Sequence, residues 1–448
     1  MSAQTTLRTS PGAGFAEDFS DEPYWWRAAR PQHIDTGIGS DRYDVVVVGS
    51  GITGMRAALD LARGGASVLV VDRDAVGFGA SRRNGGFIGR VLKKTYSELS
   101  QRYGESHARA IYSELGEAYR ATFRFIADEN IACHAVECGR FVAATSSAHQ
   151  KALVDETRAL HDAFGYDYTV ITPATMHLAM GTRAYQGGVV VPQLGSLHPG
   201  KYHQALTDLA LAAGVAIRSG VEVRQIERNR QGDRFTVTAE GLGALRADHV
   251  IIATNGYTTR KLRWHARRVV PFTGYMAATE ELPAALIEEL VPHNRTIIDT
   301  NTNIDFFRQA PDSSRLLLGG DTGCGVEGTE AVAERMRDIL RRVFPQIADV
   351  RFSNVWSGLC AGTFDMMPHL GGQDGLWYGM GYNFAGVPMG TYFGGKLAEH
   401  VLDPSAAPSI FAQQSFGTMP FYNGNPWFVP MVMRFFDWQD KRLARRSA

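Results

Sequence analysis

Near the start of the chain, the hydrophobic residues have first the pattern of a strand, then that of a helix, and then that of a strand again. The run YDVVVVG (residues 43–49) is rich in valine, as in strands that are buried on both faces of a parallel sheet. Apolar residues at helical spacing follow in residues 53–65 and end at a Gly-Gly pair, which is typical of a helix C-terminus. The run SVLVVD (residues 67–72) predicts a second strand. Together these segments predict a strand–helix–strand unit and therefore a parallel sheet.

The rest of the chain mixes helical and strand patterns. Residues 93–163 mostly have the spacing of amphipathic helices. Hydrophobic and polar residues alternate in 304–321 on both sides of a Pro-Asp-Ser-Ser turn, and this pattern predicts a β-hairpin. Further strands are expected in residues 184–191, 221–228, 234–240 and 249–256, a helix leading into a strand in 198–217, a helix in 331–346, and a second glycine-rich turn with a helix in 381–402. The pattern therefore predicts a mixed α/β fold.

The composition excludes several classes of protein. The chain has 448 residues, of which 44% are hydrophobic and 21% charged, so it is neither disordered nor fibrous. Its 46 basic and 46 acidic residues balance, and no basic surface is therefore expected to attract nucleic acid. No stretch approaches eighteen uninterrupted apolar residues, and the first residues do not resemble a signal peptide. We expect a soluble, cytoplasmic protein with no membrane partner.

The four cysteines give no sign of a metal site. Cys133, Cys138, Cys324 and Cys360 form no CxxC pair, and no histidines accompany them at the spacing of zinc ligands. We therefore expect reduced thiols and no bound metal.

The turn GSGITG after the first strand has the glycine spacing of a dinucleotide site. Gly49 allows the sharp turn, Gly51 lets the backbone approach a pyrophosphate, and Gly54 permits close packing of helix on strand. A helix that starts near Ile52 directs its free N–H groups at the phosphates. Asp72 ends the second strand, where a carboxylate can accept hydrogen bonds from ribose hydroxyls. The spacing alone does not distinguish NAD from FAD.

The stretch GFGASRRNGGFIG (residues 77–89) distinguishes FAD from NAD as the expected cofactor. It resembles the G-x-GAS-x-RNGG signature of the FAD-dependent D-amino-acid oxidase superfamily, in particular its γ-glutamylputrescine oxidoreductase-like branch. In that family the segment passes under the flavin. Residues Ser81, Arg83, Asn84, Gly85 and Gly86 match the signature, whereas Arg82 stands where the family often has glycine.

Four further stretches carry the same resemblance through nearly the whole chain. The segments around residues 195–226 and 249–258 resemble the family's adenine-facing strand and the strand end near the cofactor. Residues 355–371 and 381–398 resemble its closing strand and the helix that covers the isoalloxazine ring. The resemblance implies noncovalent FAD bound by Gly49, Gly51, Ile52, Thr53, Gly54, Asp72, Arg73, Gly79, Ala80, Ser81, Arg83, Asn84, Gly85, Gly86, Val223, Thr254, Gly256, Asn383, Gly386 and Val387.

The expected division into domains is interleaved. A Rossmann-like FAD-binding domain with a parallel sheet is expected to alternate with a substrate domain built on an antiparallel sheet. The boundaries are an N-terminal arm at 1–40, the FAD-binding domain at 41–95, 185–262 and 350–402, the substrate domain at 96–184 and 263–349, and a C-terminal extension at 403–448. Within the arm, the aromatics of PYWWRAARP are expected to pack on the body of the protein.

Two positions depart from the family pattern. Family members commonly read GYNGHGV, whereas this chain reads GYNFAGV, so Phe384 and Ala385 replace a Gly-His pair near the flavin ring. This change predicts a reshaped substrate pocket. The related monomeric sarcosine oxidase attaches its flavin to a cysteine seven residues before an aspartate. If Asp365 is that aspartate, the matching position here is Gly358, and Cys360 is offset by two residues. We therefore expect Cys360 to be a packed thiol.

The resemblance implies oxidation of a C–N bond. Hydride passes from the carbon that bears an amine to flavin N5, the imine is hydrolysed, and the flavin is reoxidised, with O2 as the expected acceptor. The backbone N–H groups of Gly386 and Val387 are the expected donors to the charge of the reduced flavin. The candidate catalytic residues are Lys261, with Arg260 as its competitor, for oxygen activation, Arg308 as a carboxylate clamp, and Tyr382 at the flavin-facing turn. Lys261 and Arg260 can equally form a solvated surface pair where a strand ends, and Arg308 can equally lie on the exposed face of its strand.

The expected substrate is a small amine or amino acid in an aromatic cavity. Its lining candidates are Phe87, Tyr275, Phe306, Trp356 and Phe384, each of which can equally belong to the core. Two alternatives stay open, namely a dehydrogenase that passes electrons to a quinone or a protein, and a non-catalytic flavin-binding subunit. An enzyme that uses only NAD(P) leaves the flavin-like stretches unexplained. The oligomeric state is open.

Overall fold

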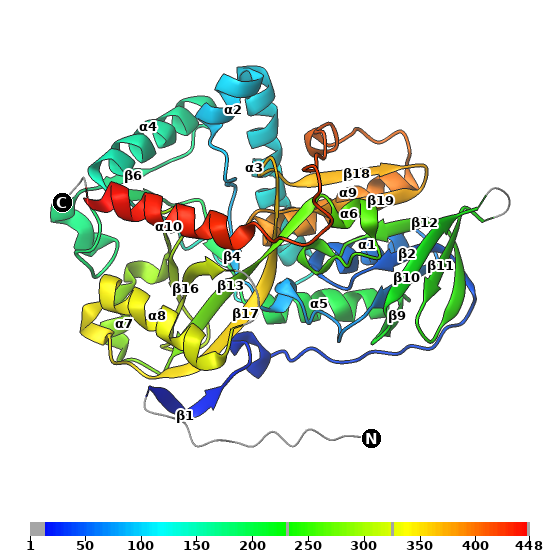
Figure 1. Ribbon diagram of the computed structural model, residues 1–448, viewed down its shortest axis with the longest axis horizontal. Coiled ribbons are helices and arrows are strands. Elements are labelled where there is room, and N and C mark those ends of the chain that lie inside the picture. The colour runs from blue at the N-terminus through cyan, green and yellow to red at the C-terminus, as the bar shows by residue number, and fades with distance from the viewer. Residues whose placement is uncertain (1–13, 230–232, 324–326, 446–448) are drawn as a thin grey trace.

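Two large β-sheets, here called sheet I and sheet II, organise the protein in this computed structural model (Figure 1). The structure describes residues 14–229, 233–323 and 327–445. The strands of sheet I lie at the right of Figure 1, and those of sheet II lie at its centre and left. The mixed α/β fold with parallel and antiparallel strands confirms the fold class expected from the sequence.

Sheet I contains the predicted parallel unit. In it β2 pairs in parallel with both β3 and β12, and β10, β11 and β12 form an antiparallel meander. Its order is β10-β11-β12-β2-β3-β9, with β19 and β18 joined to β12. The strands are β2 (Arg42–Val48), β3 (Val68–Asp72), β9 (Ala216–Ser219), β10 (Val223–Arg228), β11 (Phe235–Ala239), β12 (Gly243–Ile252), β18 (His369–Gln373) and β19 (Leu376–Met380).

The valine run of β2 is continuous because both faces of this strand are buried. Val45 and Val47 pack with Met55 and Leu59 of helix α1 (Ile52–Arg63). The alternate residues Val46 and Val48 face the opposite side, where they join a separate cluster with residues of β10, β11 and β12. A strand with side chains in two cores has no reason to alternate with polar residues.

Sheet II is mainly antiparallel and is covered on one face by α8, which packs on β13, β16 and β17. Its order is β1-β17-β13-β16-β15-β14-β5-β7-β6. The strands are β1 (Phe15–Ser20), β5 (Arg140–Ala143), β6 (Thr169–Ile171), β7 (Gly188–Val191), β13 (Val269–Thr279), β14 (Thr296–Asp299), β15 (Phe306–Gln309), β16 (Leu316–Gly323) and β17 (Phe352–Thr363); a short ladder joins β4 (Phe87–Ile88) to β8 (Gly195–Ser196).

Helices occupy the outer layers and the connections. Helix α9 packs closely on α1, and α10 crosses in front of sheet II beneath α4 (Figure 1). Within the described ranges, no helix combines the length and the apolar character needed to cross a membrane. The other helices are α2 (Tyr96–Tyr103), α3 (Glu105–Asp128), α4 (Ser147–Phe164), α5 (Pro199–Ala212), α6 (Arg263–Ala266), α7 (Ala284–Leu290), α8 (Thr329–Val343), α9 (Gly386–Leu402) and α10 (Val429–Arg445). The 3-10 turns are η1 (Tyr24–Arg27), η2 (Ala80–Arg82), η3 (Pro173–Leu178), η4 (Asn255–Tyr257), η5 (Pro292–Asn294), η6 (Pro345–Ile347) and η7 (Ile410–Ala412).

The sheets differ in one respect from the expected division of the chain. The predicted hairpin corresponds to the antiparallel pair β15 and β16, as expected. However, β7 and β17 lie in sheet II, although the segments that contain them were assigned to the FAD-binding domain. For β17 the reason is its pairing with β13, which has eleven registered positions and places β17 in sheet II. The strand β5 within residues 93–163 was not predicted at all.

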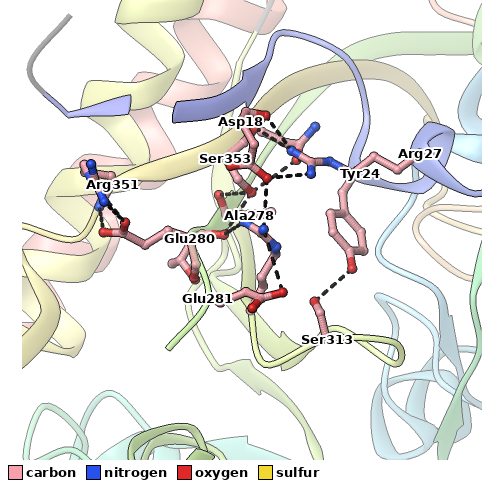
Figure 2. Close-up of polar contacts among 12 residues, drawn as sticks. Asp18, Tyr24, Arg27, Ala278, Glu280, Glu281, Ser313, Arg351 and Ser353 are labelled. Carbon is pink, nitrogen blue, oxygen red and sulfur yellow. Dashed lines mark hydrogen bonds and ion pairs between the residues drawn. The ribbon is translucent and has the colours of Figure 1, made fainter. Parts of the chain in front are cut away.

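The N-terminal segment is fixed to sheet II by polar contacts. The Asp18 carboxylate accepts hydrogen bonds from Arg27, at 2.7 Å, and from Arg315, at 2.9 Å. The Tyr24 hydroxyl donates to Asp312 at 2.6 Å and lies 2.9 Å from the Ser313 hydroxyl. Figure 2 shows Arg27 beside Asp18 and Tyr24 reaching toward Ser313. These contacts attach the N-terminal segment to residues 312–315, in the turn between β15 and β16 of sheet II, which are far away in the sequence.

One residue of this segment enters the interior. The indole of Trp25 is 0% exposed, and its Nε1 donates to the carbonyl of Asn84 at 2.8 Å. The neighbouring Trp26 ring lies 4.6 Å from the guanidinium of Arg83. The arm therefore packs directly behind the loop that carries the RNGG motif, as expected for an anchor.

Replacing Trp25 tests this anchor. We expect Trp25→Ala to lower the free energy of unfolding by about 3–5 kcal/mol, because a large buried ring leaves a cavity. Trp25→Phe should cost less, about 1–3 kcal/mol, because it mainly leaves the Asn84 carbonyl without its donor. Urea denaturation measures both values, and Trp427→Ala, whose ring is 58% exposed, is the control with little change. Equal stability of Trp25→Ala and wild type would contradict the anchor.

Candidate cofactor and active site

An elongated cavity of about 550 Å³ runs between sheets I and II. This volume lies within the range of small-molecule sites. Many of its lining residues lie in turns that follow strands. They fall within residues 48–53, 71–74, 77–85, 221–223, 253–259, 358–361 and 382–388, of which 358–361 belong to strand β17. These segments are widely separated in sequence and meet only in the fold.

The glycines of the first turn permit close contacts of backbone with backbone. Gly49 has a φ of +106°, and a Cβ there would lie 2.9 Å from the carbonyl oxygen of Ala253. A Cβ on Gly54 would lie 2.0 Å from the Gly49 carbonyl oxygen. Gly54 does not line the cavity, and its role is the close packing of α1 on β2 that the sequence predicted. The start of α1 is thereby held at the cavity wall.

Two helices begin at this cavity, and neither has an N-cap residue whose own side chain accepts from the first N–H groups. The N-cap residues are Gly51 of α1 and Ala385 of α9, and the Ile52 N–H of α1 donates instead to the Ser81 hydroxyl at 3.0 Å. Neither first turn contains an acidic residue. Free N–H groups and the positive end of a helix dipole attract phosphate or another anion. Both ends can therefore stabilise negative charge on a bound group.

Asp72 lies at the end of β3 beside the glycine turn. Its carboxylate accepts hydrogen bonds from the backbone N–H of Ser50 at 2.7 Å and from that of Asp74 at 2.9 Å. The Ser50 hydroxyl donates at 2.6 Å. Burial raises the pKa of Asp72, while these hydrogen bonds favour its charged form. Asp72 lines the cavity, as does its neighbour Arg73.

A buried network explains Arg82, whose role the sequence left open. Arg82 is 1% exposed, and its Nε donates to Nδ1 of His203 at 3.0 Å. The Nε2–H of His203 donates in turn to the carbonyl of Ser50 at 2.7 Å. Burial, and then the charge of Arg82, lower the pKa of His203 to about 3, so the ring is neutral. Arg82 therefore connects the RNGG loop to the glycine turn through α5.

The rest of the RNGG loop is held by its own polar side chains. Arg83 donates from Nε to the Phe78 carbonyl at 2.8 Å and from Nη1 to the Ser357 carbonyl at 2.9 Å. The Asn84 carbonyl oxygen Oδ1 accepts from the backbone N–H of Gly86 at 2.7 Å. Arg83 and Asn84 line the cavity, whereas Gly86 lies behind it against β8. Motif residues thus shape this wall.

The last turn before α9 has an unusual backbone. Asn383 and Phe384 both have positive φ, +46° and +78°, which is uncommon for residues that carry a side chain. The Phe384 ring is 51% exposed and contacts Phe272, with 5.2 Å between ring centroids. The ammonium of Lys93 lies 4.9 Å from the Phe384 ring centroid. A strained aromatic residue therefore stands at the mouth of the cavity.

Of the five predicted substrate residues, four line the cavity. Phe87 and Phe306 meet edge to face, with 5.6 Å between ring centroids, and Tyr275 and Phe384 are also in the wall. Trp356 does not line the cavity. Its indole is 3% exposed, packs with Trp25 and donates to the Arg83 carbonyl at 2.9 Å. Trp356 therefore supports the RNGG loop from behind. The sequence did not predict this position, because it does not distinguish the inward residues of β17 from the outward ones.

The predicted catalytic cations lie elsewhere. Lys261 forms an ion pair with Glu222 and is exposed, and its competitor Arg260 is exposed too; neither lines the cavity. Arg308 is 2% exposed, and its Nη1 donates to the carbonyls of Gly85, Gly86 and Leu197 at 2.8–3.3 Å. Arg308 is therefore not placed to bind a substrate carboxylate, as the sequence had led us to expect, and instead joins two segments of backbone.

Tyr382 lines the cavity, but its hydroxyl is engaged. That hydroxyl lies 2.5 Å from the Thr53 hydroxyl and donates to the Gly379 carbonyl at 3.0 Å. Burial raises its pKa. The contact attaches the start of α1 to the end of β19, so Tyr382 positions the turn rather than offering a free acid or base.

Cys360 lies in the cavity wall next to Gly358. Burial raises the pKa of the Cys360 thiol to about 12, which keeps it a neutral thiol. Cys133 and Cys138 are also free thiols, while Cys324 lies outside the described residues. The close approach of β17 to η4 requires Gly256, where a Cβ would lie 2.7 Å from the Cys360 carbonyl oxygen.

Several lining residues were not predicted. Asn255 accepts from the backbone N–H of Gly381 at 2.9 Å and so connects two of the lining turns. Arg90, Lys93 and Arg140 line the part of the cavity beyond Phe87. Asn255 belongs to the stretch 249–258 that resembles the family, whereas Arg90, Lys93 and Arg140 belong to no motif quoted from the sequence.

The residues present fit the FAD that the sequence resemblance implies. Two uncapped helix N-termini, a carboxylate at the end of β3 and backbone-lined turns meet along one elongated space. Asp72 is the kind of acceptor that ribose hydroxyls require, and helix N-termini suit a pyrophosphate. Seventeen of the twenty predicted FAD residues line this space, and the other three, Gly54, Gly86 and Gly256, lie behind its wall.

Comparison with known proteins agrees with this geometry. The family model described as DAO, FAD dependent oxidoreductase, matches residues 44–400. Probable oxidoreductase OrdL of Haemophilus influenzae is 29% identical, covering 82% of this chain and 85% of the relative. Gamma-glutamylputrescine oxidoreductase of Escherichia coli is 29% identical, covering 89% and 92%. The crystal structure of glycine oxidase from Geobacillus kaustophilus shares the fold, with a TM-score of 0.69 over 85% of this chain and 99% of that one, at 20% identity.

The backbone at Phe384 gives a test of strain. We expect Phe384→Gly to be more stable than Phe384→Ala by about 1 kcal/mol, because a Cβ is unfavourable at a φ of +78° and glycine is not. Thermal or urea unfolding of the two variants measures the difference. At Tyr392, inside α9, the same Gly and Ala pair should show the opposite order. The same order at both positions would contradict the strained turn.

Proposed function

The chain belongs to the DAO family of FAD dependent oxidoreductases, and we propose that it oxidises the C–N bond of a small amine or amino acid at noncovalently bound FAD. The observation that carries this proposal is the convergence of two uncapped helix N-termini and an aromatic wall on one cavity. The first end suits a pyrophosphate, and the second suits the charge of a reduced ring. The names of the relatives, which include an amine oxidoreductase and a glycine oxidase, support the substrate class.

The proposed contacts to FAD follow the walls of the cavity. The turn of residues 49–53 would bind the pyrophosphate, Asp72 the ribose, and the backbone at Val223 the adenine. The RNGG loop and the turn before α9 would enclose the ring. Bound FAD supplies a hydride acceptor, which protein side chains lack.

The chain's own residues would prepare the amine. Burial between Phe87, Phe306 and Tyr275 disfavours an ammonium ion, and so helps to keep the amine neutral without a dedicated base. The same rings exclude water from the reacting carbon. At the start of α9, the N–H groups of Gly386 and Val387 would stabilise negative charge, whereas Pro388 has no N–H to donate.

Two finer points belong to the proposal. The binding is noncovalent because Cys360, the thiol in the wall, is neutral, and attachment requires a thiolate nucleophile. Dioxygen is the proposed electron acceptor because Arg90, Lys93 and Arg140, which form no ion pair within the described residues, line the cavity, and a cation favours the reduction of oxygen to an anion.

Flavin reduction tests the proposed function most simply. We expect the purified protein to be yellow, with absorbance near about 450 nm, and acid precipitation to release the colour into the supernatant. Under anaerobic conditions, at least one compound from a panel of polyamines, γ-glutamyl-amines, N-methyl amino acids, cyclic imino acids and D-amino acids should bleach this absorbance. Mixing the reduced protein with air should restore it rapidly.

Different failures of this experiment have different meanings. A colourless protein that gains no thermal stability with added FAD would remove the flavin itself. Bleaching by none of the amines would leave a flavin-binding subunit. Colour that stays in the acid precipitate of wild type but not of Cys360→Ser would contradict noncovalent binding, and slow reoxidation by air would replace the oxidase with a dehydrogenase.

A further inference from the structure

The C-terminal extension exposes an unusual number of large apolar side chains. The five most exposed ones among the described residues all belong to it. They are 54–97% exposed and comprise Phe421, Trp427, Met431, Phe435 and Trp438. Single apolar residues are ordinary on a protein surface, whereas five of them within eighteen positions form the kind of patch that marks an interaction site.

Phe421 stands at the tip of a loop that holds its ring outward. It is 97% exposed and has a φ of +62°, which is uncommon for a residue with a bulky side chain. The next residue, Tyr422, is buried and donates from its hydroxyl to the Val269 carbonyl at 2.7 Å. The loop is therefore anchored at Tyr422, and the neighbouring ring is kept in solvent at a cost in backbone strain.

Helix α10 continues this apolar surface. Met431, Phe435 and Trp438 are spaced four and three residues apart, so they lie on one side of the helix. The opposite side is fixed to the body of the protein. There the Asp440 carboxylate accepts hydrogen bonds from the backbone N–H and the hydroxyl of Thr302, both at 3.0 Å. These bonds orient α10 with its apolar side outward.

A concentration of basic residues accompanies the apolar ones. Residues 260–268 contain five basic residues and no acidic one, and residues 404–436 contain no acidic residue at all. Arg260, Arg263 and Arg267 are exposed and form no ion pair within the described part of the chain. The balance of charge over the whole chain conceals this local excess.

The basic segment and the apolar extension are in direct contact. Arg267 donates from Nε to the Tyr422 carbonyl at 3.2 Å, and Figure 1 shows the segment before α10 passing α6. The Arg268 guanidinium lies 3.8 Å from the ring centroid of Trp264, which is itself 46% exposed. The Tyr422 ring in turn packs on Phe428, just before α10, with 5.8 Å between centroids. Arginines and exposed rings are therefore presented by neighbouring segments.

An anionic bilayer accounts for both features, and other occupants account for one at most. A second copy docked through the same face about a twofold axis would bring the arginines of both copies together. Residues 1–13, the longest segment outside the described ranges, have only Met1 and Leu7 as large apolar residues and offer no apolar cover. Tryptophan and phenylalanine rings favour the headgroup region of a bilayer, and arginines favour anionic lipids.

We propose that the loop of residues 417–428, the apolar side of α10 and the arginines of residues 260–267 dock the protein on the surface of an anionic phospholipid bilayer. The rings enter the headgroup region, and the arginines contact lipid phosphates. This proposal replaces the expectation of no membrane partner, which rested on total charge and on the lack of long apolar stretches. The inner side of α10 holds Thr302, whose carbonyl accepts from Lys93, so the docked helix also borders the mouth of the cavity.

Vesicle binding tests the docking surface. The purified full-length protein, with FAD added, is sedimented with vesicles made of equal parts of phosphatidylglycerol and phosphatidylcholine, and with vesicles of phosphatidylcholine alone. We expect binding to the anionic vesicles to be at least roughly tenfold tighter, and to weaken as salt is added, because exposed charges are screened. This measurement needs no turnover, so it stands or falls separately from the proposed oxidation of amines.

Substitutions assign the binding to this surface. The double variant Phe421→Ser with Phe435→Ser should lower the affinity for anionic vesicles at least roughly tenfold, because two rings no longer leave water. Arg263→Glu should lower it roughly fivefold or more. Leu402→Ser and Arg234→Glu remove an exposed apolar and an exposed basic residue elsewhere, and both should bind as wild type does. Melting temperatures of all variants should stay near that of wild type, since the replaced side chains are exposed.

Three results would overturn the proposal. The first is wild-type protein that stays in the supernatant with anionic vesicles, or that binds both kinds of vesicle equally. The second is vesicle binding that neither the double variant nor Arg263→Glu reduces. The third is a dimer in solution that the double variant separates while vesicles bind nothing, which would assign the face to a second copy. If the double variant does not fold, Arg263→Glu and the comparison of the two vesicles decide the question.

Discussion

The closeness of α1 to β2 is the constraint on which the rest of the site depends. Gly54 contacts the Gly49 carbonyl so tightly that no side chain fits between them. This contact places the start of α1, with its free N–H groups, at the end of the first strand. Ser50 then lies where its N–H and hydroxyl reach Asp72 on the neighbouring strand. A shift of the helix by the size of one methyl group would separate these groups.

The surrounding segments preserve that geometry from three directions. Arg82 and His203 reach the Ser50 carbonyl from α5, and Tyr382 reaches Thr53 from the last turn. Trp25 supports the RNGG loop from the N-terminal segment, which lies outside the matched family region. The polar side chains here therefore mainly form hydrogen bonds that hold the backbone in place. The backbone, in turn, presents most of the groups that face the cavity.

The sequence predicted those parts of the site that depend on local geometry. Glycine spacing, an acid at the end of a strand and buried valine runs have the same meaning in any chain that forms a strand–helix–strand unit. Phe87, Phe306 and Phe384 line the cavity because they follow or oppose such turns, and their contact with substrate stays a prediction. The positive φ of Phe384 explains why the family commonly has glycine there, although its cost became apparent only in the structure.

Side chains whose role depends on distant partners could not be predicted. Arg308 and Arg140 are both arginines of short strands, but Arg308 donates to carbonyls of two remote segments, whereas Arg140 lines the cavity and donates to the Thr296 hydroxyl and the Ile88 carbonyl. The sequence placed Lys261 near the site by its position after β12, whereas in the structure Lys261 is exposed and pairs with Glu222. Whether a strand residue faces the core, the cavity or solvent follows from the pairing of sheet II, in which β13 and β17 join positions 73 to 94 residues apart.

The central claim is that one elongated cavity, formed by backbone turns from both sheets, holds the whole of an FAD molecule. A crystal structure of the protein with FAD tests this claim most directly. The account predicts density for the pyrophosphate at the start of α1 and for the ring at the turn before α9, with Asp72 at the ribose. Density for FAD at another surface, or a ring that lies away from residues 382–388, would contradict it.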